Sequence, residues 1–194
     1  LLLVMMLTTV TTWDDTVKLK ASTSTQTWTD GKTYETNGDV TIEGRITVTG
    51  DVTLILNDGY TLSAPNGIEV KVGNSLTIEG GTNGTGTLII AKNEYSKAGI
   101  GGGSGTHSWD PIKYGNITIN GGIVNVKGGA QSAGIGGGCN SELTGNGTIT
   151  INGGIVNATG GKKAAGIGGG NGYDSAKGGC GDIVINGGQV TATG

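Results

Sequence analysis

The chain has 194 residues, which suits one domain, and 42 of them are glycine, roughly three times the usual share of ~7%. With only 2 prolines it cannot be a collagen, and the recurring Ile, Val and Thr argue against a disordered chain. The net charge of −3, with scattered lysines and one arginine, argues against a nucleic-acid-binding surface.

The first residues of the chain are apolar. Leu1–Leu7 is far shorter than the ~20 residues of a membrane-spanning helix, and it resembles the end of a signal-peptide hydrophobic region. We therefore interpret residues 1–12 as the remnant of a signal peptide. A hydrophobic first strand that caps the core is the alternative. The polar segment 13–37 is expected to cap the N-terminal end of the fold, and residues 38–194 are expected to form the main domain.

Short segments with period-two alternation of apolar and polar residues begin after residue 37. They predict strands that are separated by glycine-containing turns. The predicted strands of the first half are Val40–Ile42, Ile46–Val48, Val52–Leu56, Tyr60–Leu62, Ile68–Val70, Leu76–Ile78, Leu88–Ile90 and Ala98–Ile100.

A clear internal repeat occupies the second half of the chain. The sequence ITINGG at Ile117–Gly122 returns at Ile149–Gly154, and as IVINGG at Ile183–Gly188, with shifts of 32 and 34 residues. A second alternating segment follows each copy. The sequence AGIGGG occurs at Ala98–Gly103, Ala133–Gly138 and Ala165–Gly170. Glycine every few residues excludes helices, because each costs about 1 kcal/mol in a helix interior.

The repeats predict an all-β fold, a right-handed parallel β-helix with three short strands per rung and about five to six rungs. Strands this short bury their apolar side only when one repeat stacks on the next. Two columns of like residues are expected, Ile119 on Ile151 on Ile185 and Val124 on Val156 on Val190. The last rung stops at Gly194 without a cap, so the domain is expected to be part of a longer multidomain chain.

Polar residues at the turns are interpreted as structural. Asn120, Asn152 and Asn186 each precede Gly-Gly and predict an asparagine ladder, with a binding role as the alternative. Asp39, Asp51 and Asp182 exchange with Asn or Thr in other rungs, which indicates turn residues rather than catalytic carboxylates. Glycines 99, 134 and 166 are expected to leave an outer strip without side chains, covered by loops or by a ligand.

Three insertions leave the fold after AGIGGG, at Ser104–Gly115, Cys139–Gly147 and Asn171–Gly181. They are expected to stack into one surface, and loops on a rigid scaffold often carry function. Its aromatic residues should be partly exposed, because a narrow Ile/Val core has no room for them. Alternatively, Trp109 anchors its loop. The candidate ligand-binding residues are Trp109, Asp110, Tyr114, Tyr173, Asp174 and Lys177.

The two cysteines lie in neighbouring insertions. An even cysteine count in an exported chain favours a disulfide, so Cys139 and Cys180 are expected to pair or to lie close together. Gly169–Asp174 matches the start of a calcium-binding nonapeptide once, but that motif binds calcium when it repeats in tandem. No cofactor is expected, and calcium has no assignable ligands.

Several motifs resemble those of repetitive secreted or surface-anchored bacterial proteins. They are ITINGGIVNATGG (149–161), AGIGGG, WTDGKTY (28–34) and GDVTIEGRITVTGDV (38–52), and the resemblance covers most of the chain from Trp28 onward. Such proteins are similar to bacterial carbohydrate-binding β-helix domains, some of which bind acidic plant polysaccharides with calcium. The resemblance implies a secreted or cell-surface location and carries over no metal ligands.

These observations lead to three functional hypotheses. The first is a non-catalytic adhesion or carbohydrate-binding module, with a polysaccharide or a cell-surface glycan as the partner. The second is a structural spacer of a surface protein. The third is a polysaccharide lyase-like enzyme, which would need clustered carboxylates and a basic residue that the sequence does not group together.

Overall fold

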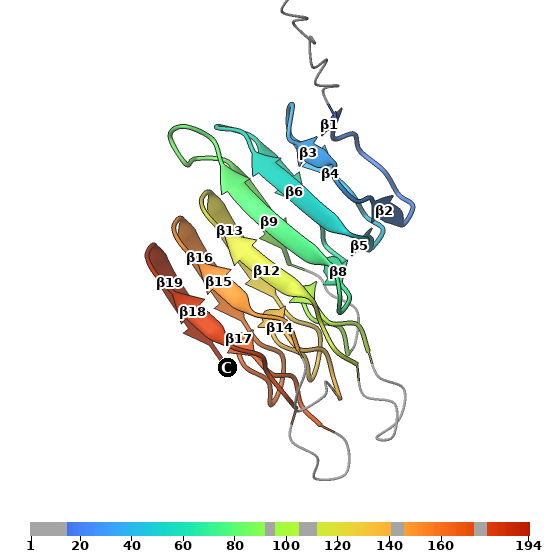
Figure 1. Ribbon diagram of the computed structural model, residues 1–194, viewed down its shortest axis with the longest axis vertical. Coiled ribbons are helices and arrows are strands. Elements are labelled where there is room, and N and C mark those ends of the chain that lie inside the picture. Colours follow the sequence, from blue (N-terminus) through green and yellow to red (C-terminus); the bar gives the residue numbers. More distant parts are fainter. Residues whose placement is uncertain (1–14, 92–95, 105–111, 141–145, 173–177) are drawn as a thin grey trace, which may run out of the picture.

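The computed structural model describes residues 15–91, 96–104, 112–140, 146–172 and 178–194. Within these residues the chain forms 19 strands and no helix, and the pairs between these strands are parallel. The strands form three sheets of six or seven strands, so the predicted parallel β-helix with three strands per rung is confirmed. About six rungs lie along the axis, as Figure 1 shows for the sheet that faces the viewer.

Each sheet takes one strand from each rung, in sequence order. The first sheet contains β1 (Thr16–Lys18), β3 (Thr33–Glu35), β6 (Asp51–Leu56), β9 (Ser75–Gly80), β12 (Asn116–Ile119), β15 (Ile149–Ile151) and β18 (Ile183–Ile185). The second sheet contains β4 (Val40–Thr41), β7 (Thr61–Ser63), β10 (Thr87–Ile90), β13 (Ile123–Lys127), β16 (Ile155–Thr159) and β19 (Gln189–Thr193). The third sheet contains β2 (Gln26–Trp28), β5 (Ile46–Val48), β8 (Ile68–Val70), β11 (Ile100–Gly101), β14 (Ile135–Gly136) and β17 (Ile167–Gly168).

The core consists of columns of aliphatic side chains that run along the axis. Ile119 lies in register with Ile151, and Ile151 with Ile185, as the repeat predicts. The column of Val124, Val156 and Val190 is confirmed in the second sheet. Burial of each such side chain contributes roughly 1.5–3 kcal/mol, so many short strands together provide a stable core. At the last rung the column ends with Ile185, which is 54% exposed.

The outer face of the first sheet carries a row of threonines. Six of them lie at the same position of successive strands, and side chains alternate between the two faces of a strand. They are Thr16, Thr33, Thr53, Thr77, Thr118 and Thr150. Most of the flanking positions are polar or charged, such as Asp51, Ser75 and Glu79, and Ile55 is an apolar exception. The buried and exposed faces of this sheet therefore follow the period-two pattern of the sequence.

The N-terminal segment was expected to cap the stack, but it forms part of it. β1 and β3 pair in the first sheet, and β2 pairs with β5 in the third sheet. The expected start of the helix at residue 38 is thus wrong. The strands before residue 38 were missed because they are too short and too polar to show a clear alternation in the sequence. Trp28 and Tyr34 fill the core here, with stacked rings 4.7 Å apart between centroids.

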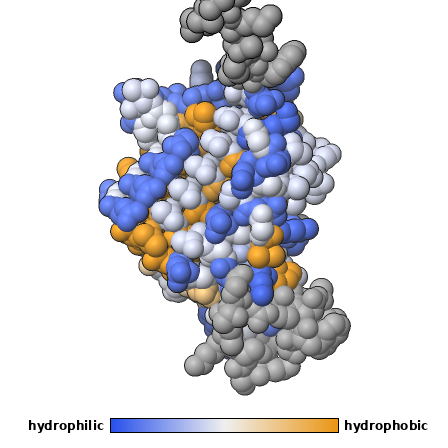
Figure 2. Space-filling model, viewed as in Figure 1, coloured by the Kyte–Doolittle hydropathy of each residue, from blue (hydrophilic) through white to orange (hydrophobic). Residues whose placement is uncertain are grey.

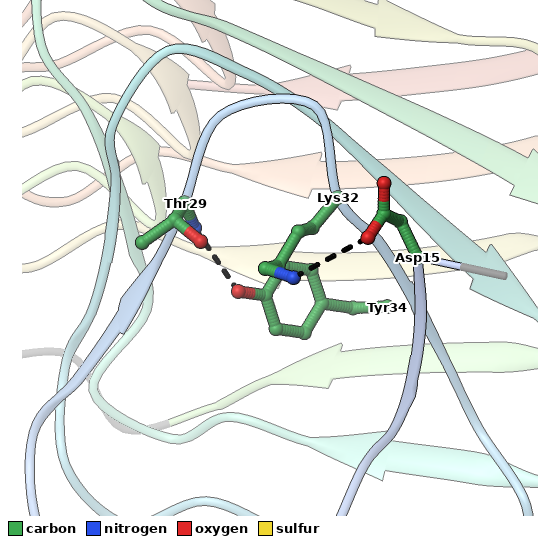
Figure 3. Close-up of polar contacts among 4 residues, drawn as sticks. All are labelled: Asp15, Thr29, Lys32 and Tyr34. Atoms are coloured by element: carbon green, nitrogen blue, oxygen red, sulfur yellow. Dashed lines mark hydrogen bonds and ion pairs between the residues drawn. The ribbon is translucent and has the colours of Figure 1, made fainter. Parts of the chain in front are cut away.

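Polar contacts hold this end together (Figure 3). The amide of Thr29 donates a hydrogen bond to the Tyr34 hydroxyl at 3.0 Å. Lys32 and Asp15 form an ion pair of 3.7 Å between partly exposed side chains. Such an exposed pair contributes little to stability, so the buried aromatic stack is the main contact of this region.

Arg45, the single arginine, directly precedes β5 of the third sheet, and its side chain is buried. Its guanidinium donates to the carbonyl oxygen of Asn66 at 2.8 Å and to those of Ala98 and Gly102 at 3.2 and 3.4 Å. The side chain thus connects the backbone of three successive rungs. This position is structural, as buried cations require dense hydrogen bonding.

Candidate functional site

The last three turns that connect the first sheet to the second share the sequence Asn-Gly-Gly. The second glycine of each turn has a positive φ, +79° at Gly122, +82° at Gly154 and +85° at Gly188. Residues with a Cβ rarely adopt this conformation, which explains why glycine recurs there. Because these three turns are identical and their strands are in register, equivalent groups recur along this edge in the last three rungs.

The asparagines of these turns form a ladder of side-chain hydrogen bonds. Asn152 Nδ2 donates to Asn120 Oδ1 at 2.8 Å, and Asn186 Nδ2 donates to Asn152 Oδ1 at 2.7 Å. An amide has two donor hydrogens and two acceptor lone pairs. Each ladder contact uses one of each, so an interior amide keeps one donor and one acceptor for another partner.

Glu79 ends this ladder on the N-terminal side. Asn120 Nδ2 donates to Glu79 Oε1 at 2.6 Å, a short distance that is typical of a charge-assisted bond. The amides of the ladder thus all point toward a carboxylate. Hydrogen bonds in such a chain polarise one another, so the Glu79 charge strengthens the contacts beyond it.

The connection between β9 and β10 is a longer loop, residues 81–86, and Asp58 of the preceding rung holds it. The amides of Asn83 and Thr85 donate to the two oxygens of the Asp58 carboxylate at 2.8 and 2.9 Å. The Thr85 hydroxyl adds a contact of 3.1 Å. The backbone bonds from Asn83 and Thr85 hold the pKa of Asp58 below its ordinary value. The loop is therefore fixed by an ionised carboxylate.

A groove of about 360 Å³ lies between this loop and the Asn-Gly-Gly turns. We name it the glycine groove. It is lined by Glu79, Gly80, Gly81, Thr82, Asn83, Gly84, Asn120, Gly121, Gly122, Gly154 and Ile155. Backbone forms most of its floor, and Ile155, which is 39% exposed, provides an apolar wall. Figure 2 shows bands of hydrophilic side chains and of paler ones that run along this side of the stack.

The outer face of the second sheet continues this surface. Ile123 and Ile155 are neighbours in register, and so are Asn125 and Asn157. Asn157 Nδ2 donates to Asn125 Oδ1 at 2.9 Å, which makes a second amide ladder. A shallower groove of about 260 Å³ follows it between Ile89 and Thr159. Apolar side chains thus lie between two rows of amides.

Three segments of the chain match the beta helix repeat family, residues 117–139, 149–171 and 183–194. This is a β-helix repeat protein. The matched segments contain the three Asn-Gly-Gly turns and two of the three AGIGGG sequences, so the repeats seen in the sequence are those that build the rungs. The comparisons find no significant match among curated proteins or among solved structures.

Most of the loop residues expected to bind a ligand in this β-helix lie outside the described residues. These are Trp109, Asp110, Tyr173, Asp174 and Lys177. The sixth, Tyr114, was expected to be partly exposed, and this was wrong because its side chain is fully buried. The Tyr114 side chain occupies space at the loop corner, where there is more room than in the narrow core between the strands.

Tyr114 contacts residues far away in the sequence. The Gly181 amide donates to its hydroxyl at 2.9 Å, and its hydroxyl lies 3.5 Å from Cys180 Sγ. Burial raises the pKa of Tyr114, and the contact with Cys180 raises it further. The phenol therefore stays neutral and links the insertions of different rungs, a structural role.

Cys139 and Cys180 are both free thiols, so the disulfide expected between them is not formed. Their side chains have different neighbours. Cys139 is buried and its Sγ contacts Gln131 Oε1 at 3.4 Å, whereas the Cys180 thiol lies 3.0 Å from the Gly181 carbonyl. A disulfide between them would need these contacts to be exchanged.

The glycines of the third sheet do not leave a bare outer strip. Gly99, Gly134 and Gly166 are buried. A Cβ on Gly134 would lie 2.6 Å from the Gly166 oxygen and 2.9 Å from the Thr159 oxygen. These positions face the ends of the second-sheet strands of the following rungs. Close packing of backbone on backbone, rather than a loop or a ligand, explains why they are glycine.

In residues 15–91, 96–104, 112–140, 146–172 and 178–194, no group of three His, Cys, Asp or Glu side chains could hold a metal ion. The same part of the chain has no helix that is long and apolar enough to span a membrane.

Sequence reasoning missed the glycine groove. The asparagines were identified, but as turn residues, and Glu79 and Ile155 were assigned no role. One signal was available, since residues 81–86 make the connection between β9 and β10 longer than the two-glycine turns of the later rungs. A loop inserted next to a regular column of turns can project beyond them and form one side of a groove.

Proposed function

We propose that this β-helix is a non-catalytic glycan-binding or adhesion module of a secreted or cell-surface protein, and that the glycine groove is its binding site. The groove itself carries the proposal, since it places polar groups next to an exposed aliphatic side chain. Binding sites commonly combine an apolar wall with a few placed polar groups. The sequence resemblance to secreted bacterial carbohydrate-binding β-helix domains supports the same function and location.

A sugar ring matches this arrangement chemically. Its C–H face packs on apolar side chains, and Ile155 offers 39% of its surface. Its hydroxyls donate and accept, and the Asn120 amide and the Glu79 carboxylate provide both kinds of partner. The floor lacks side chains at Gly121, Gly122 and Gly154, so a ring can approach the backbone closely.

The proposal of a non-catalytic module rests on the carboxylates. Glycoside hydrolysis uses a pair of carboxyl groups on either side of the scissile bond. Among the described residues that line the groove, Glu79 is the carboxylic acid, and it is engaged by Asn120. Release of reducing sugars or of unsaturated products from a bound polysaccharide would contradict this part of the proposal.

A glycan array with the purified chain tests the proposal, followed by titration of the best ligand. We expect Asn120→Ala and Ile155→Ser to weaken binding about tenfold each, the effect of losing roughly 1.4 kcal/mol of contact. Val72→Ala is the matched control, because Val72 is an exposed aliphatic residue, 54% accessible, that does not line the groove. Weaker binding by Trp109→Ala, with Asn120→Ala unchanged, would move the site to the loop surface.

A structural spacer is the second candidate, and one observation favours it. The hydrogen-bonded sheets run without interruption through the described rungs, and the two asparagine ladders reinforce them from outside. A rod of this kind keeps other domains at a fixed distance. Absence of binding to every glycan on the array would leave this function in place of the first.

A further inference from the structure

The polar groups of the glycine groove recur along the helix axis rather than around a single pocket. Glu79, Asn120, Asn152 and Asn186 occupy the same position of four successive rungs and are joined in one chain of hydrogen bonds. We propose that the ligand is a linear, neutral polysaccharide that lies along this column, with about one sugar for each rung. This inference rests on the proposed function and specifies its ligand.

The spacing of the rungs supports this orientation. Neighbouring strands lie about 4.8 Å apart, so the ladder presents equivalent amides at that interval. This interval is close to the length that one sugar adds to an extended, β-linked chain. Each interior amide keeps one donor and one acceptor, which suits a hydroxyl that can itself both donate and accept. A polymer laid along the axis would therefore meet the same partners at each step.

The adjacent sheet provides a second set of contacts parallel to the first. Ile123 and Ile155 lie side by side along the axis, and the Asn125–Asn157 ladder runs beyond them. The aliphatic pair is thus between two rows of amides. A chain whose ring faces pack on the aliphatic pair can direct its edge hydroxyls to both rows, which a single pocket does not offer.

The loop 81–86 sets the position of the polymer. It lines the groove at the Glu79 end, where Asp58 holds it, and in Figure 1 it extends beyond the turns of the later rungs. The column is open in the other direction, toward Asn186. The chain end is therefore expected beside the loop, with the rest of the polymer over the C-terminal rungs.

The charge of the groove selects between neutral and acidic polymers. Glu79 brings a negative charge to the closed end, and its Oε1 atom already accepts from Asn120 at 2.6 Å. The other ladder residues are neutral amides. A uronic acid next to Glu79 would place two carboxylates together, which is unfavourable unless a cation lies between them. The geometry thus points to neutral chains.

Calorimetric titration with cello-, xylo- and chito-oligosaccharides, from monosaccharide to hexasaccharide, tests the inference. We expect affinity for at least one series to rise about fivefold for each added sugar, roughly the effect of one net hydrogen bond, up to the tetrasaccharide. In this 194-residue chain longer ligands should add little, because the described residues provide four positions of the column. Equal affinity for a monosaccharide and a tetrasaccharide would overturn the axial arrangement while leaving glycan binding in place.

Two variants locate the polymer on the column. Asn120→Ala should weaken both disaccharide and tetrasaccharide binding, whereas Asn186→Ala should weaken only the tetrasaccharide, about fivefold. Glu43→Gln, an exposed change outside the groove, is the control. Equal effects of Asn186→Ala on both ligands would overturn the axial arrangement.

An acidic series completes the test. Tighter binding of oligogalacturonates than of the neutral oligosaccharides, measured with a chelator present, would overturn the assignment of a neutral ligand. No binding of any glycan, in solution or on the array, would refute the proposed function together with this inference.

Discussion

The two halves of this β-helix stabilise their corners in different ways. In the first half each corner has its own contact: Asp30 Oδ1 accepts from the Asp51 amide at 2.8 Å, and Asp39 Oδ1 accepts from the Thr61 amide at 2.8 Å. In the second half one residue type contacts itself in the next rung, as in the Asn120–Asn152–Asn186 ladder. Varied contacts distinguish one rung from the next, whereas identical ones create a repeated surface.

This difference separates the tasks of the two halves. A contact between unlike residues forms in one register only, so the first half is expected to fix the alignment of the stack. A ladder of identical residues forms equally well after a shift by a whole repeat. The second half is therefore less specific in register, but it presents equivalent groups at regular intervals. Four predictions test this comparison.

The largest effect is expected at Arg45, the most connected residue of the first half. Arg45→Ala leaves the carbonyl oxygens of Asn66 and Ala98 without this donor, whereas that of Gly102 still accepts from the Ala98 amide. Buried acceptors without partners cost about 1–3 kcal/mol each, so we expect the free energy of unfolding to fall by about 3 kcal/mol. Chemical denaturation measures it. Arg45→Lys should recover part of the loss, because a lysine keeps the charge but not the planar fork.

A loss below about 1 kcal/mol for Arg45→Ala would contradict this role. Glu43→Ala, an exposed change two residues earlier, is the control and should have almost no effect.

A smaller effect is expected at Gly134 in the second half. Its Cβ position faces the Gly166 and Thr159 oxygens at 2.6 and 2.9 Å, both on backbone that cannot turn away. Gly134→Ala should lower the free energy of unfolding by about 2 kcal/mol through overpacking. Gly31→Ala, where φ is +70° and no atom lies within 4 Å, isolates the cost of backbone conformation alone, about 1 kcal/mol. Equal melting temperatures of wild type and Gly134→Ala would contradict the close backbone packing and support the bare outer strip predicted from the sequence.

The contrast between the halves also explains what the sequence could predict. Identical residues at a fixed interval reveal the fold, because the columns of Ile119 and Val124 are visible as periodicity. Contacts between unlike residues leave no such pattern, so the pairing of Asp58 with Asn83 and the burial of Arg45 could not be read from it. Tyr114 belongs to the same class, since its partners Cys180 and Gly181 lie 66 and 67 residues away.

The ladder should respond weakly but measurably to a break. Asn152 contributes to two ladder contacts and Asn186 to one. We expect Asn152→Ala to lower the free energy of unfolding by about 1 kcal/mol and Asn186→Ala by about half of that, since each exposed hydrogen bond has a modest net value. A double-mutant cycle of Asn120 and Asn152 measures the coupling directly. A coupling energy of zero would show that the amides are bonded to water instead.

The smallest effect on global stability is expected at Asp58, which holds the loop that lines one end of the glycine groove. Its folded-state pKa lies below the ordinary value of 3.8, chiefly because of the backbone bonds from Asn83 and Thr85. A lowered folded-state pKa means that the stabilisation is fully present above the unfolded pKa. It is lost as the pH falls through the folded pKa. The loop 81–86 should therefore remain ordered at neutral pH and loosen in acid.

The response is best followed at the loop itself, because Asp58 is only partly buried and contributes little to the whole fold. The amide resonances of Asn83 and Thr85 should shift together below the ordinary carboxyl pKa, and their hydrogen exchange should accelerate relative to that of the strands. Asp58→Asn should remove this pH dependence, because its amide does not titrate in that range. Glycan affinity should fall over the same pH interval if the loop forms a wall of the site. Resonances of Asn83 and Thr85 that do not respond to acid, or that respond equally in Asp58→Asn, would show that another group holds the loop.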